Sequence, residues 1–327
     1  MRGAKIGISE VAEKMISIAM ATYNGEHFLR EQMDSILAQT VSDWELIACD
    51  DCSSDGTWEI LQEYAKSDSR IKIHRNEQNL GFKKNFEKAI SLCTGEYIAL
   101  SDQDDIWTEN HLEVLVKNIG EKSIAGANAE LIDKEGQSKN ILLNKVDGFD
   151  FYAGEDKFLW RIIFRSGPIQ GTSMLIKRDS LAHFLPIPSK VKFHDAWFIA
   201  CACLDKGISY SFQVITKYRQ HGNNVTFESH NKNDVAPFCI LFRKIKHFFL
   251  GTFTDRFAYC SELEKRYGKI NEDFCTICEI VDRIKKKSLR FSDIKTLWKN
   301  YEFIMSQKGH RKFFEKLIAW TRWQAYD

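Results

Sequence analysis

The stretch SDQDDIW, residues 101–107, follows an apolar segment and carries three carboxylates, on Asp102, Asp104 and Asp105. Carboxylates this close repel one another and oppose folding unless a cation or strong hydrogen-bond donors compensate them. Two carboxylates separated by one residue can bind Mg²⁺ or Mn²⁺, ions that often take phosphate oxygens as further ligands. The alternative is an acidic turn that is only solvated. The stretch therefore predicts either a divalent-cation site or a solvated loop.

A second acidic pair stands in the stretch ACDDCSSDGT, residues 48–57. Asp50 and Asp51 end an apolar run, and the Ser, Asp and Gly residues that follow are typical of a tight turn and a helix N-cap. A capping role alone would account for Ser54 and Asp55 but would leave Asp50 and Asp51 without a partner. Asp50 or Asp51 could instead accept the N–H of a pyrimidine base while a metal ion holds a diphosphate.

The elements that must position these groups are short apolar runs that alternate with amphipathic segments. The predicted strands cover residues 15–23, 44–51, 71–76, 96–102 and 123–133. Helical patterns follow the strands; in residues 25–40, for example, Leu29, Met33 and Ile36 fall on one face. Strand and helix in turn predict an α/β fold with a mostly parallel central sheet flanked by helices.

Ligands of such sheets bind beyond the carboxyl ends of the strands. This rule predicts that residues 22–24, the pair Asp50 and Asp51, and residues 102–105 surround one cleft. Between about Gly136 and Arg165 the periodicity weakens, and we expect surface loops there. Apolar segments return after residue 167, and we expect them to complete a first domain, residues 1–231.

The second predicted domain, residues 232–327, is basic, aromatic and helical in pattern. The chain carries 46 Lys and Arg and 45 Asp and Glu, but residues 236–327 hold 19 of the bases and 11 of the acids, which leaves 27 bases and 34 acids before them. Interleaved bases and aromatics fit helices on an anionic membrane face or, alternatively, a subdomain packed on the rest. Because the other part is acidic, we expect no nucleic-acid partner.

Cysteine usage and hydropathy bear on the compartment. Nine cysteines is an odd number, and several lie in apolar runs, as reduced thiols do in cytosolic proteins. Cys275 and Cys278 have the spacing of zinc ligands, but a second pair at suitable spacing is missing. No long apolar segment follows the N-terminus, and the apolar stretch at residues 235–253 is interrupted by bases. We expect a cytoplasmic protein that can lie peripherally on the inner face of the plasma membrane.

Seven motifs in order resemble the family 2 glycosyltransferases, which have the GT-A fold, a Rossmann-like α/β architecture. They are MISIAMATYNGEHFLREQMDSILAQT, DDCSSDGT, NLGFKKNF, GEYIALSDQDDIW, the segment at Gly171-Thr172, FHDAW and YRQHGNNV. The resemblance runs from about Met15 to Val225. Within the family, SDQDDIW, HDAW and YRQHGNNV are similar to bacterial rhamnosyltransferases and related polysaccharide glycosyltransferases.

The resemblance assigns the donor site residue by residue. The residues it implies for the nucleotide and sugar are Thr22, Tyr23, Asn24, Asp50, Asp51, Asn79, Gly81, Lys83, Asn85, Asp102 and Gly171. Asp102 and Asp104 match the D-x-D motif that holds Mg²⁺ or Mn²⁺, and His221 matches a histidine that approaches the metal or the diphosphate. Asp195 matches the catalytic base, although the family more often shows Glu-Asp where this chain has His-Asp; an N-cap role is the alternative for Asp195.

The resemblance implies an inverting, metal-dependent transfer of a sugar from a nucleotide-diphosphate donor to a hydroxyl of a lipid-linked or growing surface polysaccharide. A metal ion stabilises the charge on the leaving diphosphate, and a separate carboxylate accepts the proton of the acceptor hydroxyl. The expected donor is dTDP-L-rhamnose, with a UDP-hexose as the alternative. Two further alternatives are a nucleotide-sugar-binding scaffold without catalysis and a nucleotidyltransferase, although the chain lacks the glycine-rich phosphate loop of the latter.

Overall fold

The computed structural model describes residues 15–147, 151, 155–164, 169–221, 259–268, 272–286, 288 and 290–299. The chain divides into two compact units. The first, here called the sheet unit, comprises Met1–Val146, Ile169–Ile187 and Asp205–His221. The second, here called the helical unit, comprises Asp147–Pro168, Pro188–Leu204 and Gly222–Asp327. The predicted boundary at residues 231 and 232 lies outside the described residues and stays a prediction.

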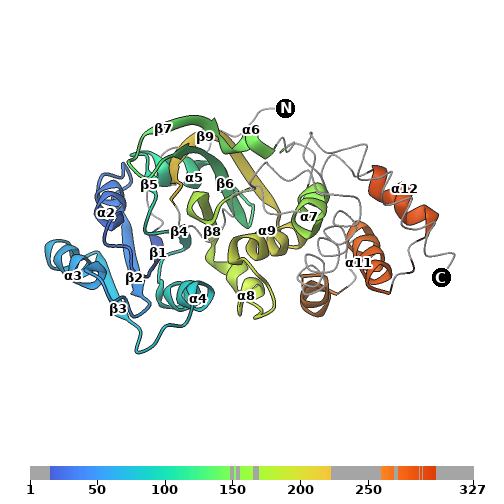
Figure 1. The fold of residues 1–327 in the computed structure, drawn as a ribbon, viewed down its shortest axis with the longest axis horizontal. Coiled ribbons are helices and arrows are strands. Elements are labelled where there is room, and N and C mark those ends of the chain that lie inside the picture. The colour runs from blue at the N-terminus through green and yellow to red at the C-terminus, as the bar shows by residue number, and fades with distance from the viewer. Residues whose placement is uncertain are drawn as a thin grey trace, which may run out of the picture. The chain divides into compact units, whose positions relative to one another are not determined.

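A nine-stranded sheet forms the centre of the described part of the sheet unit (Figure 1). Its path runs β3-β2-β1-β4-β8-β6-β9-β5, and β7 pairs with β6 off this path. The strands are β1 Ile16–Thr22, β2 Trp44–Asp50, β3 Ile71–Arg75, β4 Tyr97–Ser101, β5 Ile106–Trp107, β6 Ile124–Ile132, β7 Ser138–Leu142, β8 Met174–Lys177 and β9 Ile208–Arg219. The first four on the path are parallel, whereas β8 is antiparallel to both β4 and β6. The predicted α/β fold is confirmed, and parallel pairing occurs among β3, β2, β1 and β4 and also between β6 and β9.

Four helices connect and cover the first strands. They are α2 Leu29–Leu37, α3 Thr57–Ser67, α4 Phe82–Leu92 and α5 His111–Ile119. In α2 the residues Leu29, Met33 and Ile36 are fully buried, as the 3.6-residue periodicity predicts. The strands β1 and β2 are buried along almost their whole length because helices cover a parallel sheet on both faces.

The segment from Gly136 to Arg165, predicted as surface loops, contains regular structure, so that prediction is wrong. It holds β7, a short helix α6 Leu143–Asp147, and α7 Glu155–Phe164. Leu159 and Trp160 of α7 are fully buried. Aromatic residues and the run FLWRIIF, in which Arg161 alone is polar, obscure helical periodicity when a helix is buried on several sides. The remaining short elements of the sheet unit are η1 Gly171–Ser173, η2 Arg178–Ser180 and α8 Leu181–Phe184.

The helical unit is built from α7, α9 His194–Leu204, α11 Glu272–Lys285 and α12 Phe291–Lys299, with a further helical stretch at residues 259–267. Most residues of α9, from His194 to Leu204, are buried, as in a helix enclosed on all sides. Trp197 and Phe198 of α9 and Phe274 of α11 are fully buried. Arg283 forms two hydrogen bonds of 2.8 Å to the buried carboxylate of Asp293, which ties α11 to α12. Such a bidentate pair adds geometric specificity.

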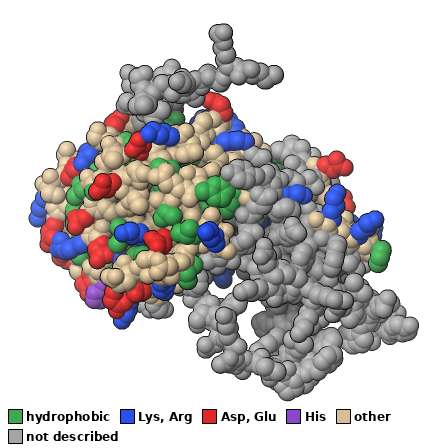
Figure 2. All heavy atoms as spheres, turned by 90° about the horizontal axis from the view of Figure 1, so that it is seen from above, with side chains coloured by type: hydrophobic (Ala, Val, Ile, Leu, Met, Phe, Trp, Pro, Cys, Tyr) green, Lys and Arg blue, Asp and Glu red, His purple; other side chains and the backbone are tan. Residues whose placement is uncertain are grey.

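The charge and hydropathy of the described residues bear on the predicted membrane contact. Figure 2 shows acidic and basic side chains interspersed with apolar ones on the face in view. Among the described residues, no helix is long and apolar enough to cross a membrane. All residues from 236 to 258 lie outside the described part, so the predicted membrane contact of residues 236–327 stays a prediction.

Glu45 is the centre of a polar cluster at the amino end of the sheet. Its buried carboxylate accepts hydrogen bonds from Ser17 at 2.6 Å, from the backbone N–H and the hydroxyl of Thr94 at 2.6 and 2.7 Å, and from Lys72 at 2.7 Å. Burial alone would raise the pKa of Glu45, but these donors outweigh it and lower the pKa to about 2. The ionised carboxylate therefore links β1, β2 and β3 to the turn before β4.

We expect Glu45→Gln to lower the free energy of unfolding at pH 7 by about 1–3 kcal/mol, because the amide loses charge-assisted hydrogen bonds. Since the folded pKa lies below the ordinary value of 4.5, the contribution of Glu45 is complete above pH 4.5 and is lost as the pH falls towards 2. Urea denaturation at pH 7 and at pH 3 measures both effects. Glu59→Gln, at an exposed position of α3, is the matched control; equal stability of the two variants at pH 7 would contradict this role.

Candidate active site at the carboxyl ends of β1, β2 and β4

The three predicted loops meet at one edge of the sheet. In the ladder between β1 and β2, Thr22 lies opposite Asp50, and the backbone N–H of Asp51 donates to the carbonyl of Thr22 at 2.8 Å. On the other side of β1, Met20 lies opposite Ser101, the last residue of β4. The residues that follow these strands are therefore neighbours, as the carboxyl-end rule predicts.

Asp50 is fully buried, and its carboxylate accepts hydrogen bonds within the turn that follows β2. One of its carboxylate oxygens accepts from the backbone N–H of Ser53 at 3.1 Å, and the other accepts from the hydroxyls of Ser53 and, at 3.2 Å, Thr22. The guanidinium of Arg75 lies 3.4 Å away and balances the charge. Asp50 therefore shapes the turn.

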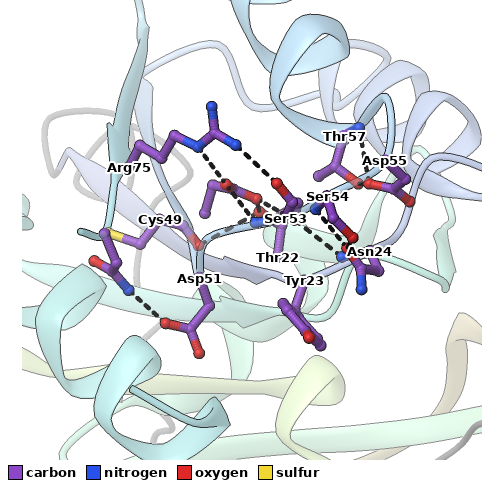
Figure 3. A network of polar contacts seen from close by, with 12 residues as sticks. Thr22, Tyr23, Asn24, Cys49, Asp51, Ser53, Ser54, Asp55, Thr57 and Arg75 are labelled. Atoms are coloured by element: carbon purple, nitrogen blue, oxygen red, sulfur yellow. Dashed lines mark hydrogen bonds and ion pairs between the residues drawn. The ribbon is translucent and has the colours of Figure 1, made fainter. Parts of the chain in front are cut away.

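Asp51 points away from that cluster, to the same side as Tyr23 (Figure 3). Its carboxylate accepts from the backbone N–H groups of Leu80 and Gly81, each at 2.8 Å, and from the amide of Asn76 at 2.7 Å. A carboxylate has about four acceptor positions, so three are occupied. Asp51 is only 2% exposed; it holds the loop before α4 and faces the same side as the half-exposed Tyr23.

Asn79 and Gly81 lie before α4, and Lys83 and Asn85 lie within it. Asn79 is exposed and accepts from the backbone N–H of Gly81 at 3.0 Å, and Gly81 has φ of +79°, which glycine adopts without strain. Asn85 is buried; its amide donates to the carbonyl of Cys49 and accepts from Asn76. Lys83 is half-buried, and burial together with Lys84 lowers its pKa.

Asn76 and Lys88 were not predicted, and they complete this part of the site. Lys88 donates to the side-chain carbonyl of Asn76 at 2.7 Å, and Asn76 donates in turn to Asp51 and Asn85. A signal for Asn76 exists in the sequence, because a polar residue follows the apolar positions of β3 at its carboxyl end. Lys88 gives no such signal, since it has the pattern of a solvated helix face.

The acidic turn after β4 has three carboxylates in two environments. Asp102 and Asp104 are partly exposed, whereas Asp105 is 1% exposed. One carboxylate oxygen of Asp105 accepts from the backbone N–H of Arg219 at 2.9 Å; the other, Oδ2, is buried with no hydrogen-bond partner among the described residues. Burial and the charges of Asp104 and Asp102 raise the pKa of Asp105 well above its ordinary value. The raised pKa favours the protonated form of Asp105, and protonation would reduce the repulsion within the turn.

The buried side chain of Arg219 ties this turn to two distant segments. Its Nε donates to the carbonyl of Asp104 at 2.8 Å, and Nη1 donates to the carbonyl of Lys134, in the turn between β6 and β7, at 3.0 Å. Nη2 pairs with the carboxylate of Glu31 in α2. A guanidinium carries its donors on three nitrogens of a rigid plane and can reach three separated acceptors, whereas an ammonium carries all its donors on one nitrogen.

His221 and Phe28 extend this cluster. Nε2 of His221 lies 2.7 Å from Oδ2 of Asp104, so these two predicted metal ligands are in direct contact with each other. The Phe28 ring stacks on the imidazole with 4.9 Å between ring centroids, and the guanidinium of Arg219 lies 4.9 Å from the centre of the same ring. Phe28 is therefore held between two side chains of the segment that ends the described sheet unit.

The Gly171 segment contacts Trp107, which follows the acidic turn. Gly171 begins η1 and is buried, and the hydroxyl of the next residue, Thr172, accepts from the indole N–H of Trp107 at 3.2 Å. Trp107 stacks on the buried ring of His111 with 3.8 Å between centroids. Burial lowers the pKa of His111 to about 3, so this ring is neutral. These contacts fix the position of Trp107, the residue that ends the SDQDDIW stretch.

Asp195, the predicted base, belongs to the helical unit. It is partly exposed in the first turn of α9, and its carboxylate accepts from the backbone N–H of Ala196 at 2.6 Å. An acid in this position also interacts favourably with the helix dipole. Asp195 is the second residue of α9, and the carbonyl of Phe193 accepts the first helical hydrogen bond, from the N–H of Trp197 at 3.2 Å. Asp195 therefore does not occupy the N-cap position that its capping alternative requires, and its catalytic role stays a prediction.

We expect Arg219→Lys to lower the free energy of unfolding by about 1–3 kcal/mol, because lysine cannot reproduce the three-way contact of the buried guanidinium. Urea denaturation followed by tryptophan fluorescence measures the change. Arg30→Lys is the matched control, since Arg30 makes an exposed ion pair with Glu63. Wild-type stability in Arg219→Lys would show that the guanidinium does not hold the acidic turn.

Comparison with known proteins adds an independent finding. The sequence model of the family described as "Glycosyl transferase family 2" matches residues 17–183, just over half of the chain. The UDP-Glc:alpha-D-GlcNAc-diphosphoundecaprenol beta-1,3-glucosyltransferase WfgD of Escherichia coli is 40% identical over 183 residues, covering 47% of this chain and 72% of WfgD. The putative teichuronic acid biosynthesis glycosyltransferase TuaG of Bacillus subtilis (strain 168) is 37% identical over 111 residues, covering 34% of this chain and 44% of TuaG. The chain thus spans less than half the length of TuaG.

Among solved structures, the crystal structure of S. aureus TarS 1–349 in complex with UDP-GlcNAc is similar to this one. The TM-score is 0.58 at 17% sequence identity, and the match covers 89% of this chain and 82% of TarS 1–349. At this identity the likeness concerns the fold alone.

Proposed function

The chain belongs to glycosyl transferase family 2, and we propose that it transfers a sugar from a nucleotide-diphosphate donor to a hydroxyl of a polysaccharide or lipid-linked glycan. The observation that carries this proposal is the meeting of Tyr23, Asp51 and the acidic turn at one edge of the sheet. The aromatic ring and the carboxylate acceptor suit the base of such a donor. The carboxylates of the acidic turn suit a metal ion that binds its diphosphate.

We assign the nucleotide to Tyr23 and Asp51 rather than to Asp50. Tyr23 is 49% exposed and Leu80 is 39% exposed, so both offer apolar surface beside Asp51. Asp51 retains acceptor capacity for the N–H of a pyrimidine, whereas Asp50 is enclosed by Ser53, Thr22 and Arg75. The other predicted donor-binding residues stay predictions.

The metal assignment fits the donor chemistry of this turn. Carboxylate oxygens of Asp102 and Asp104 and an imidazole nitrogen of His221 are ligands that Mn²⁺ accepts, and carboxylates also suit Mg²⁺. Among the described residues, no three His, Cys, Asp or Glu side chains are arranged as a ready metal site. The contact between His221 and Asp104 brings two of the ligand types together. When bound, the ion supplies positive charge that stabilises the leaving diphosphate.

The transfer also needs a group that accepts the proton of the attacking hydroxyl. We propose Asp195 for this role; attack from the side opposite the diphosphate then inverts the anomeric centre, with no covalent intermediate. The polysaccharide or lipid-linked acceptor is proposed from the similarity to WfgD, a glucosyltransferase acting on alpha-D-GlcNAc-diphosphoundecaprenol, and to TuaG, a putative glycosyltransferase of teichuronic acid biosynthesis. For the donor, the similarity to WfgD favours UDP-glucose, and dTDP-L-rhamnose remains the prediction from the motifs.

The first test is thermal unfolding with UDP, dTDP, GDP and CDP, each with and without Mn²⁺. Binding to the native state stabilises it by about 2.7 kcal/mol at 100 times the dissociation constant. We expect a metal-dependent increase in Tm with UDP or dTDP in the wild type, and its loss in Asp104→Asn. Asp43→Asn, exposed before β2, is the control and should respond as the wild type. A wild type that responds to no nucleotide would contradict the proposed function.

The second test concerns the proposed base. Asp195→Asn should lower kcat for sugar transfer by about 10²–10⁴, because a positioned general base contributes on that scale. Nucleotide-dependent stabilisation should persist in the variant, since Asp195 is proposed to contact the acceptor and not the base of the nucleotide. Radiolabelled donor with the wild type and the variant measures the rate. Near-normal turnover by Asp195→Asn would show that Asp195 is not the base.

A further inference from the structure

Gln103, the middle residue of the D-x-D motif, makes two hydrogen bonds that no other side chain of the turn makes. Its amide oxygen accepts from the backbone N–H of Tyr23 at 2.8 Å, and its amide nitrogen donates to the carbonyl of Tyr23 at 3.0 Å. The ladder between β1 and β4 ends where Met20 faces Ser101. The carboxamide of Gln103 therefore pairs with the chain beyond the end of that ladder, as a strand backbone would.

The loop that carries Tyr23 is held from the opposite side by the turn after β2. The backbone N–H of Asn24 donates to the hydroxyl of Ser53 at 2.9 Å, and the side-chain oxygen of Asn24 accepts from the backbone N–H of Ser54 at 2.9 Å (Figure 3). Asn24 has φ of +48°, a left-handed conformation that Asn tolerates better than most residues. Tyr23 thus lies between two turns, and Gln103 is its connection to the acidic one.

Gly25 makes room for this connection. A Cβ atom added at Gly25 would lie 2.2 Å from Oε1 of Gln103 and 2.7 Å from Nε2, which no real contact allows. Any side chain at position 25 would force the carboxamide away from Tyr23. The glycine is therefore required by the neighbouring amide and not by its own backbone torsion, because its φ lies outside the left-handed region.

From this juxtaposition we propose that Gln103 is a positioning residue for the donor nucleotide. Its carboxamide holds the backbone of Tyr23 and so sets the place of the aromatic ring relative to the acidic turn. The residue between the two acids then couples base recognition to diphosphate binding. This inference rests on the proposed function, since it takes Tyr23 as the surface for the base.

The experiment compares Kd values for UDP and dTDP, measured by isothermal titration calorimetry with Mn²⁺, in the full chain. Gln103→Met keeps the length of the side chain but removes both hydrogen bonds. We expect nucleotide binding to weaken about tenfold, which is about 1.4 kcal/mol. Inorganic diphosphate, which lacks a base, should bind Gln103→Met as it binds the wild type. Gln62→Met, at an exposed position of α3, is the control and should leave every Kd unchanged.

A double-mutant cycle tests whether Gln103 acts through Tyr23. In a Tyr23→Ala background, Gln103→Met should change the Kd for the nucleotide by less than about twofold, because the ring to be positioned is absent. Gly25→Ala displaces the amide without changing residue 103 and should repeat the loss seen in Gln103→Met. Additive effects of Tyr23→Ala and Gln103→Met, or an equal loss of diphosphate binding, would overturn the inference.

The outcomes separate the inference from the proposed function. A wild type that binds neither UDP nor dTDP overturns both. A wild type that binds one of them, together with unchanged binding in Gln103→Met and Gly25→Ala, overturns the positioning role alone. Thermal unfolding of each variant shows that the fold is retained, which is expected because Gln103 is only partly buried.

Discussion

The mutual repulsion of three carboxylates at the end of β4 is the constraint on which this site depends. Two features compensate it: Asp105 is buried with a raised pKa, and the chain returns at Arg219 to donate to Asp105 and Asp104. The same guanidinium reaches Glu31 and Lys134. Because these partners come from α2, the turn after β6 and the end of β9, the acidic turn can form only when the second half of the sheet is in place.

The two ends of the parallel strands are stabilised by different means. At the amino end, the single ionised carboxylate of Glu45 gathers donors from three neighbouring segments. At the carboxyl end, loops are joined by side chains that replace backbone pairing, as Gln103 does for Tyr23 and Ser53 for Asn24. Side-chain contacts of this kind hold loop residues in one arrangement before a ligand arrives, which reduces the ordering cost of binding.

Several side chains that shape the site could not be found from sequence. Arg219 lies 114 positions after Asp105, and within an aromatic strand pattern nothing distinguishes it from a solvated base. Phe28 has the pattern of a core residue, and only the structure shows its ring between Arg219 and His221. The α7 segment was missed because the residues from Phe158 to Ile163 are all buried, the polar Arg161 among them, so burial does not follow the polar positions of the sequence. Conversely, Asp50 and Asn85 were predicted from motif position, and the structure engages both in the protein's own hydrogen bonds.

Local chemistry in the sequence determined the parallel strands and the loops that meet at their carboxyl ends. Strand periodicity and loop composition are properties of short segments, and strand order follows from right-handed crossovers. Tertiary structure decided which carboxylate is buried with a raised pKa, that Asp51 faces the same side as Tyr23, and that Gln103 pairs with a backbone 80 residues before it. The physical reason is that burial and hydrogen-bond partners belong to the folded neighbourhood of a side chain, so residue type and spacing do not specify them.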